Sequence, residues 1–159
     1  MNDSKTELSG FFKRIQLIHK AIMMSPIIAG IIVYQMADNP YLLFIEAWDT
    51  LLVVVISGII LGFYFSDLLF KNYLSKISTN TSLPKKLEGF QAAYLLKMVL
   101  LEIPALLSAG IFFLTQNLLY LIIIGGIVVY MSFLSPKKEK IILALDLRGA
   151  ERDKVNQAQ

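Results

Sequence analysis

The chain has 159 residues, 56% of them hydrophobic, and its mean hydropathy is +0.63. This length allows one domain, and this apolar content is too high for a water-soluble surface. The absence of cysteine and the single histidine exclude disulfides, thiol nucleophiles and histidine-based metal clusters. The net charge of +3 is only mildly basic, and we expect no nucleic-acid partner, metal or cofactor.

The first 14 residues form a basic, amphipathic segment in which we expect no cleavable signal peptide. Leu8, Phe11, Phe12 and Ile15 share its apolar face. Either this segment lies along the membrane surface, or the first spanning helix begins early within it.

Four apolar stretches follow, and each approaches the ~20 residues that a helix needs to cross a bilayer. They cover about residues 15–36, 47–70, 92–114 and 118–134. Their length excludes buried strands, which usually run about 4–8 residues between turn signals. The sequence therefore predicts an all-α fold: an integral membrane four-helix bundle over residues 15–134, arranged as two in-out-in hairpins.

Small residues recur at every fourth position in three of these spans. They are Ala21, Ser25 and Ala29 in the first span, Gly58, Gly62 and Ser66 in the second, and Ala105 and Ala109 in the third. This spacing lets helix backbones approach closely. The close approach joins helices within one chain, or it forms a homo-oligomeric contact. Pro26 and Pro104 are expected to kink the first and third spans.

The third span carries a carboxylate, Glu102, about ten residues from its start and therefore near mid-membrane. Two readings stay open: a neutral carboxyl that donates a hydrogen bond to a facing helix, or a site for a proton or cation. Because Glu102 and Ala105 lie within about 60° of one another, we expect the carboxyl to point into the bundle.

Three further polar residues lie at the inner end of the spans. Lys97 is shallower than Glu102 and can extend to the interface, and Asp67 lies at a similar depth at the end of the second span. We expect Asp67 to be the partner of Lys97. His19, beside Lys20, is expected to be solvated.

The tail, residues 135–159, predicts one short amphipathic helix. Ser135 is the expected N-cap, and Pro136 takes the first helical position. Ile141, Ile142 and Leu145 share a face, and Gly149 is expected to end the helix. Such a helix contacts anionic lipid headgroups or a partner protein.

The basic residues predict the orientation in the membrane. Fourteen of the fifteen lie at the start of the chain, within the central loop 71–91, or in the tail, whereas residues 35–49 and 115–117 have none. By the positive-inside rule, we expect both termini and the central loop to be cytoplasmic.

Residues 20–30 parallel residues 97–110, because each segment combines a lysine, a proline and small residues. This indicates a parallel repeat of two hairpins, or a chance similarity between apolar segments.

Several short motifs occur in order over nearly the whole chain. They are Lys97, LLE ending at Glu102, PAL from Pro104 to Leu106, LTQN from Leu114 to Asn117, and KIILALDL from Lys140 to Leu147 after Pro136. This pattern resembles a family of short four-helix bacterial inner-membrane proteins, sometimes labelled as major-facilitator transporters. Ile103 departs from the glycine that the family has between Glu and Pro. The chain is too short for the twelve spans of that superfamily, so the resemblance implies a fold and no activity.

A second resemblance, in outline, is to the proteolipid subunits of rotary ATPase rotor rings. Those subunits pair a glycine-rich helix with a helix that carries a mid-membrane carboxylate. Here Gly58, Gly62 and Ser66 precede a basic loop and then Glu102. The resemblance implies a carboxylate that binds a proton or a cation.

No phosphate-binding glycine loop, HExxH motif or nucleophile with a base is present, so we expect no enzyme. The leading hypothesis is a non-enzymatic membrane protein that acts as a subunit or interaction module of a membrane complex. Its expected partners are the lipid bilayer and either further copies of itself or another membrane protein. The alternative is a proton- or cation-translocating component that uses Glu102.

Overall fold

The computed structural model describes residues 3–44, 50–77 and 81–157, with side chains from Leu8 onward. Within these ranges the chain forms six helices and no strand beyond an isolated bridge. They are α1 (Asp3–Gln35), α2 (Thr50–Ser75), α3 (Leu83–Thr115), α4 (Leu119–Phe133), α5 (Lys138–Ala144) and α6 (Ala150–Gln157). The all-α prediction is confirmed, although the predicted start of the second span, residue 47, lies outside the described residues.

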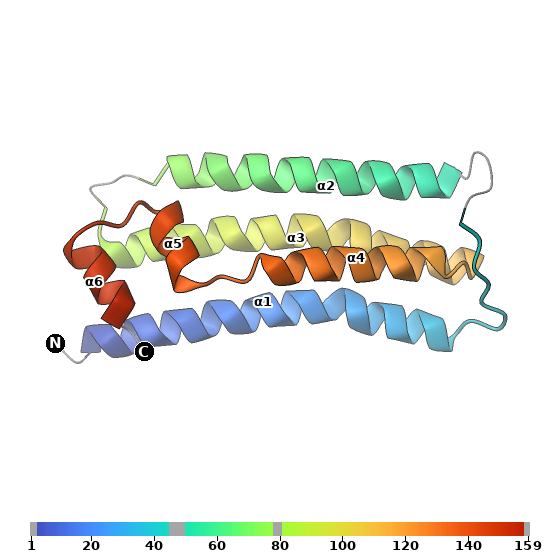
Figure 1. Ribbon diagram of the computed structural model, residues 1–159, viewed down its shortest axis with the longest axis horizontal. Helices are drawn as coiled ribbons and strands as arrows, with labels where there is room; N and C mark the ends of the chain where they lie inside the picture. Colours follow the sequence, from blue (N-terminus) through green and yellow to red (C-terminus); the bar gives the residue numbers. More distant parts are fainter. Residues whose placement is uncertain (1–2, 45–49, 78–80, 158–159) are drawn as a thin grey trace.

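The four longer helices lie side by side, and α5 and α6 fold over the end of the bundle where both termini lie (Figure 1). The central helix is α3, which packs against α2, α1 and α4, while α1 also packs against α4. Among the described residues, α2 packs mainly on α3. The helices α1 and α2 run antiparallel (Figure 1) but do not pack on each other as a hairpin, whereas α3 and α4 do.

Three helices are long and apolar enough to cross a membrane: α1 from Leu8, α2 and α3. The 15 residues of α4 extend only about 22 Å at 1.5 Å per residue. That helix passes the same test only together with α5, from which it is separated by a bend of 76°. The described residues thus contain three candidate spans, or four if the bent pair counts as one.

The helices extend beyond the predicted spans. Because α1 is continuous from Asp3, the basic N-terminal segment is the early part of the first helix rather than a separate surface helix. The predicted loop 71–91 is largely helical, since α2 continues to Ser75 and α3 begins at Leu83. Pro84 lies in the first turn of α3, where its missing N–H costs nothing. Hydropathy marks where a helix enters lipid, and a helix can continue past that point.

The small residues of α2 face α3. A Cβ atom added to Gly62 would lie 3.0 Å from the carbonyl oxygen of Leu100 and 3.4 Å from Cγ of Pro104. One turn away, Gly58 faces Pro104 as well, and Ser66 is buried. Pro104 has no N–H to donate to the Leu100 carbonyl, so the α2 backbone approaches α3 at a carbonyl that its own helix leaves free. These residues therefore pack within one chain.

The small residues of α1 and α3 are less uniform. Ala105 and Ala109 of α3 are buried, but Ala21 of α1 is exposed, and Ser25 and Ala29 are half-buried. The close approach of α1 to α4 occurs instead at Gly30, where an added Cβ would lie 3.7 Å from Leu121 and 3.8 Å from Ile124. The predicted packing stripe on α1 is therefore displaced around the helix.

Pro26 and Pro104 are both buried and lie inside uninterrupted helices. Their expected kinks stay a prediction.

At the end opposite the termini, Asn117 fastens the connection after α1 onto the α3–α4 turn. Its amide nitrogen donates to the carbonyl of Leu43, and its amide oxygen accepts from the N–H of Leu119.

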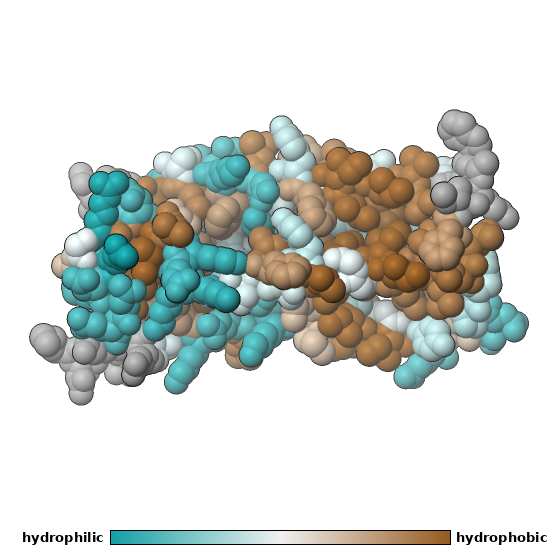
Figure 2. Space-filling view, in the orientation of Figure 1, coloured by the Kyte–Doolittle hydropathy of each residue, from teal (hydrophilic) through white to brown (hydrophobic). Residues whose placement is uncertain are grey.

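The surface divides along the length of the bundle. Figure 2 shows hydrophilic residues gathered over the end that holds α5 and α6, and apolar residues over much of the opposite half of this face. The exposed apolar side chains include Ile28 and Ile31 on α1 and Ile60 and Tyr64 on α2.

Candidate functional site

An ion pair joins α2 and α3 at the depth where α4 ends. The Nζ of Lys97 lies 2.5 Å from a carboxylate oxygen of Asp67, which matches the pairing expected from their depth. The Lys97 side chain is 11% exposed and that of Asp67 is 51% exposed. The Lys97 ammonium also lies 5.1 Å from the centroid of the Phe70 ring. A buried ammonium needs such partners because its desolvation is costly.

The depth of this pair follows from helix length. Asp67 is about 25 Å from the start of α2, and Lys97 is about 27 Å from the end of α3, at 1.5 Å per residue. Both distances are slightly less than the ~30 Å hydrocarbon core of a bilayer. The pair therefore lies at slightly less than one hydrocarbon-core thickness from the opposite end of the bundle.

A second polar contact ties α1 to α3 and to the end of α4. The hydroxyl of Tyr94 lies 2.7 Å from Nδ1 of His19 and donates to the backbone carbonyl of Leu134 at 3.2 Å. His19 is buried, so the prediction that it is solvated is wrong. The sequence shows only that it stands beside Lys20, and the tyrosine that covers it is 75 residues away.

A pocket of about 330 Å³ lies beside these contacts, between the ends of α2, α3 and α4, with α5 on one side. Its walls are mainly aromatic: Phe70, Phe90, Tyr94, Tyr130 and Phe133. Two cationic side chains, Lys97 and Lys140, also line it. The sequence predicts the pairing of Lys97 with Asp67 but not the pocket, because the fold alone brings α5 and the aromatic residues beside Lys97.

Glu102 lies within α3 and does not line this pocket. It is half-buried, between the fully buried Leu101 and the exposed Ile103. Within the described part of the chain, no residue forms a hydrogen bond or ion pair with its carboxylate. The expected hydrogen bond to a facing helix is therefore not formed, and its role as a proton or cation site stays a prediction. Across the described residues, no group of three or more acidic or histidine side chains is placed to hold a metal ion.

The tail differs from its prediction. Ser135 and Pro136 are not the start of a helix, because they form the bend between α4 and α5, and the N-cap of α5 is Lys137. Gly149, at φ +51°, lies in the link between α5 and α6 instead of ending the predicted helix. The tail is therefore two short helices.

The apolar face of the tail packs on its own bundle. Ile141, Leu147 and Val155 are buried in one cluster with Phe12 of α1 and Leu87 of α3. The opposite face of α5 presents Leu143, which is 80% exposed. Because the apolar face is buried against the bundle, the predicted contact with lipid headgroups or a partner falls to the outer face of α5 and to the basic residues of the tail.

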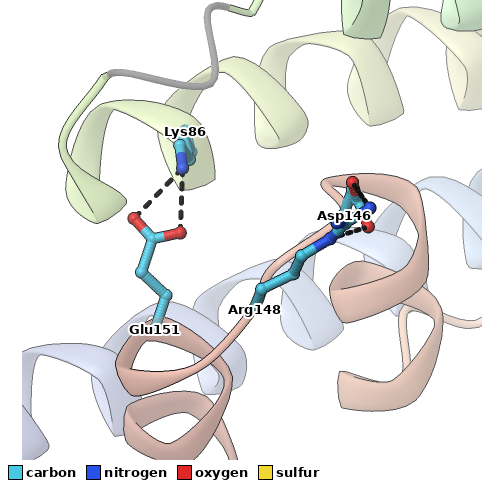
Figure 3. Close-up of polar contacts among 4 residues, drawn as sticks. All are labelled: Lys86, Asp146, Arg148 and Glu151. Carbon is cyan, nitrogen blue, oxygen red and sulfur yellow. Dashed lines mark hydrogen bonds and ion pairs between the residues drawn. The ribbon is translucent and has the colours of Figure 1, made fainter.

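Two ion pairs of the tail have very different surroundings (Figure 3). Glu151 of α6 accepts two hydrogen bonds, of 2.8 and 3.1 Å, from the Lys86 ammonium of α3, whose side chain is only 8% exposed. Arg148 pairs with Asp146 on the exposed link between α5 and α6. The first pair fastens α6 to the bundle, whereas the second lies within the tail itself.

No protein-family model, curated protein or solved structure matches this chain. The functional interpretation therefore depends on the geometry described above.

Proposed function

We propose that this chain is an integral protein of the bacterial inner membrane and acts as a non-enzymatic interaction module of a membrane complex. Both termini, the α2–α3 connection and α5–α6 lie in the cytoplasm. The observation that carries the proposal is the division of the surface into a long apolar bundle and a charged cap at one end, which α5 and α6 form.

The orientation rests on the basic residues. The end that holds the cap also holds Lys13 and Arg14 of α1, Lys71 and Lys76 near the end of α2, and Lys85 near the start of α3. Basic residues close to the ends of spanning helices are retained on the cytoplasmic side.

The role as an interaction module is supported by how polar groups at membrane depth are used. Asp67 is paired with Lys97, and His19 with Tyr94, so these groups stabilise the bundle. Ser108 donates to the carbonyl of Pro104 within α3. The outer surfaces of α1 and α2 are apolar and offer contact area to lipid or to neighbouring helices.

A second candidate function, transport of a proton or cation, is favoured by Glu102 alone. Its half-buried carboxylate has no partner in the described part of the chain, and an ionisable group at this depth is a functional hypothesis by default. Asp67 does not add to this candidate, because its charge is compensated by Lys97.

One pair of measurements separates the two functions. We expect Glu102→Gln to insert, fold and purify in mild detergent with the same mass and the same co-purifying partners as the unchanged chain. We also expect carbodiimide to modify Glu102 to the same extent with and without added cations. Protection of Glu102 by one cation species, or a purified protein that is a lone monomer in both forms, would contradict the interaction module.

A further inference from the structure

We propose that the pocket between the ends of α2, α3 and α4 binds the phosphate headgroup of an anionic phospholipid from the cytoplasmic leaflet. The inference rests on the membrane placement proposed above and adds a specific ligand to it. It is argued from the depth of the pocket, its walls, its charge and its size.

The pocket lies at the height of lipid headgroups. Its base, Lys97, is about 27 Å along α3 from the opposite end of the bundle. The hydrocarbon core of a bilayer is ~30 Å thick, so this depth is the boundary between acyl chains and headgroups. Phe133 lines the pocket and is 73% exposed, so the wall that it forms also faces the lipid.

The walls are suited to a group that is partly apolar. Phe90 stacks on Tyr94 and meets Phe70 edge to face, in both cases with ring centroids 5.9 Å apart. Above the pocket, Phe63 of α2 contacts Tyr130 of α4 at 4.4 Å between centroids. These rings exclude water from one side of any bound group, which strengthens its electrostatic contacts with the lysines.

The charge of the pocket selects an anion. The Lys97 ammonium has three N–H donors and donates one to Asp67, and Lys140 donates one to the carbonyl of Phe133 at 2.6 Å. Among the described residues, no acidic side chain lines the pocket or pairs with Lys140. Asp67 compensates one of the two positive charges, so one charge and several donors remain for a phosphate oxygen.

The size of the pocket limits what enters it. A volume of about 330 Å³ is at the lower end of the ~300–1,000 Å³ typical of small-molecule sites. That space takes a phosphate and its glycerol group but not two acyl chains. The acyl chains therefore stay in the bilayer, beside the apolar outer surface of the bundle.

The test is binding of matched lipids to the purified full-length chain in a neutral detergent, followed by native mass spectrometry. The probes are phosphatidylglycerol and phosphatidylcholine with identical acyl chains. We expect phosphatidylglycerol to bind about tenfold more tightly, as a charge-assisted contact provides. Lys140→Gln should remove most of this preference, and Ala144→Leu, which fills the pocket without changing its charge, should weaken binding of phosphatidylglycerol as much.

The matched control is Lys137→Gln, an exposed lysine three residues away that does not line the pocket. It should change binding less than about twofold, because only diffuse surface charge is lost. Equal losses for Lys137→Gln and Lys140→Gln, equal binding of the two lipids, or displacement of phosphatidylglycerol by millimolar inorganic phosphate would each overturn the proposal. The mass and partners of the purified complex are measured separately, so failure here is distinguishable from failure of the proposed function.

Discussion

Lys97 and Asp67 form one ion pair, but the lysine is buried and the aspartate is half-exposed. We therefore expect mutations of the two residues to change stability by different amounts. Asp67→Asn leaves a buried ammonium without its counter-charge, whereas Lys97→Met leaves a carboxylate that is half-exposed. Because an unpaired buried charge costs more than an exposed one, we expect Asp67→Asn to lower the free energy of unfolding by about 1–3 kcal/mol and Lys97→Met by less than about 1 kcal/mol. Unfolding in mixed micelles with increasing denaturing detergent measures both. Equal losses would contradict the unequal burial.

Gly62 offers a second test at the scale of one residue, because its hydrogen faces the carbonyl of Leu100 and the ring of Pro104. Gly62→Ala places a methyl group 3.0 Å from that oxygen, so α2 must shift away, and we expect a loss of about 1–3 kcal/mol in the free energy of unfolding.

The matched control for this change is Gly110→Ala on α3, where an added Cβ would meet nothing within 4 Å. There the better helix propensity of alanine should leave stability unchanged or raise it by up to about 1 kcal/mol. The same unfolding assay applies, and a neutral Gly62→Ala would show that α2 and α3 are not held this closely.

For single small residues, the sequence predicts their spacing along a helix better than the neighbouring helix that they face. Periodicity placed Gly58, Gly62 and Ser66 on one face, and that face does meet α3. The same reasoning selected Ala21, which is exposed, and missed Gly30, which meets α4. A helix in lipid is apolar on every side, so no polar face indicates which small residues turn inward.

At the scale of whole helices, the long apolar runs identified all four elements of the bundle, because only helices satisfy their own backbone groups in lipid. The tail was harder to predict. Its second helix, α6, has one buried apolar residue, Val155, and apart from Ala150 is otherwise polar. The sequence predicts Pro136 at a helix start, but α4 ends only two residues before Ser135, and Pro136 lies in the bend between α4 and α5.

The attachment of α6 depends on the Lys86–Glu151 pair, and this makes a prediction about local opening. Glu151→Gln leaves the buried Lys86 ammonium without a counter-charge, so we expect the amides of α6 to exchange with solvent about tenfold faster. Hydrogen–deuterium exchange followed by mass spectrometry measures this on residues 150–157.

Arg148→Gln is the control, because it breaks an ion pair whose side chains are 82% and 68% exposed. Exposed pairs contribute little, so the exchange of α6 should stay within about twofold of the unchanged chain. If both variants accelerate exchange equally, α6 is held by general charge attraction and not by the buried contact.

At the scale of the whole molecule, the sequence similarity between the two halves does not extend to their packing. Residues 20–30 belong to α1 and residues 97–110 to α3, and these two helices point the same way (Figure 1). However, α3 packs against α1, α2 and α4, whereas α2 packs mainly on α3 instead of on α1. A similarity between apolar segments cannot encode such differences, because they depend on which partner each helix meets.

The proposed orientation is testable because the chain has no native cysteine. A single cysteine at Asp38→Cys, in the connection after α1, should react with a membrane-impermeant maleimide in intact spheroplasts. A single cysteine at Gln157→Cys, at the end of α6, should react only after the membrane is permeabilised. Both positions are exposed, so accessibility reports the side of the membrane. The reverse pattern, or labelling of both in intact spheroplasts, would contradict cytoplasmic termini.

The shortness of α4 has a consequence for the surrounding bilayer. Its 15 residues extend about 22 Å before the chain bends away, whereas the 26 residues of α2 extend about 39 Å. In the proposed membrane, α2 can continue past the headgroups, but a hydrocarbon core of ~30 Å is thicker than α4 is long, so lipids beside α4 must thin. Such hydrophobic mismatch costs a fraction of a kcal/mol per Å. The protein is therefore expected to be sensitive to acyl-chain length and to concentrate where the membrane is thinner than average.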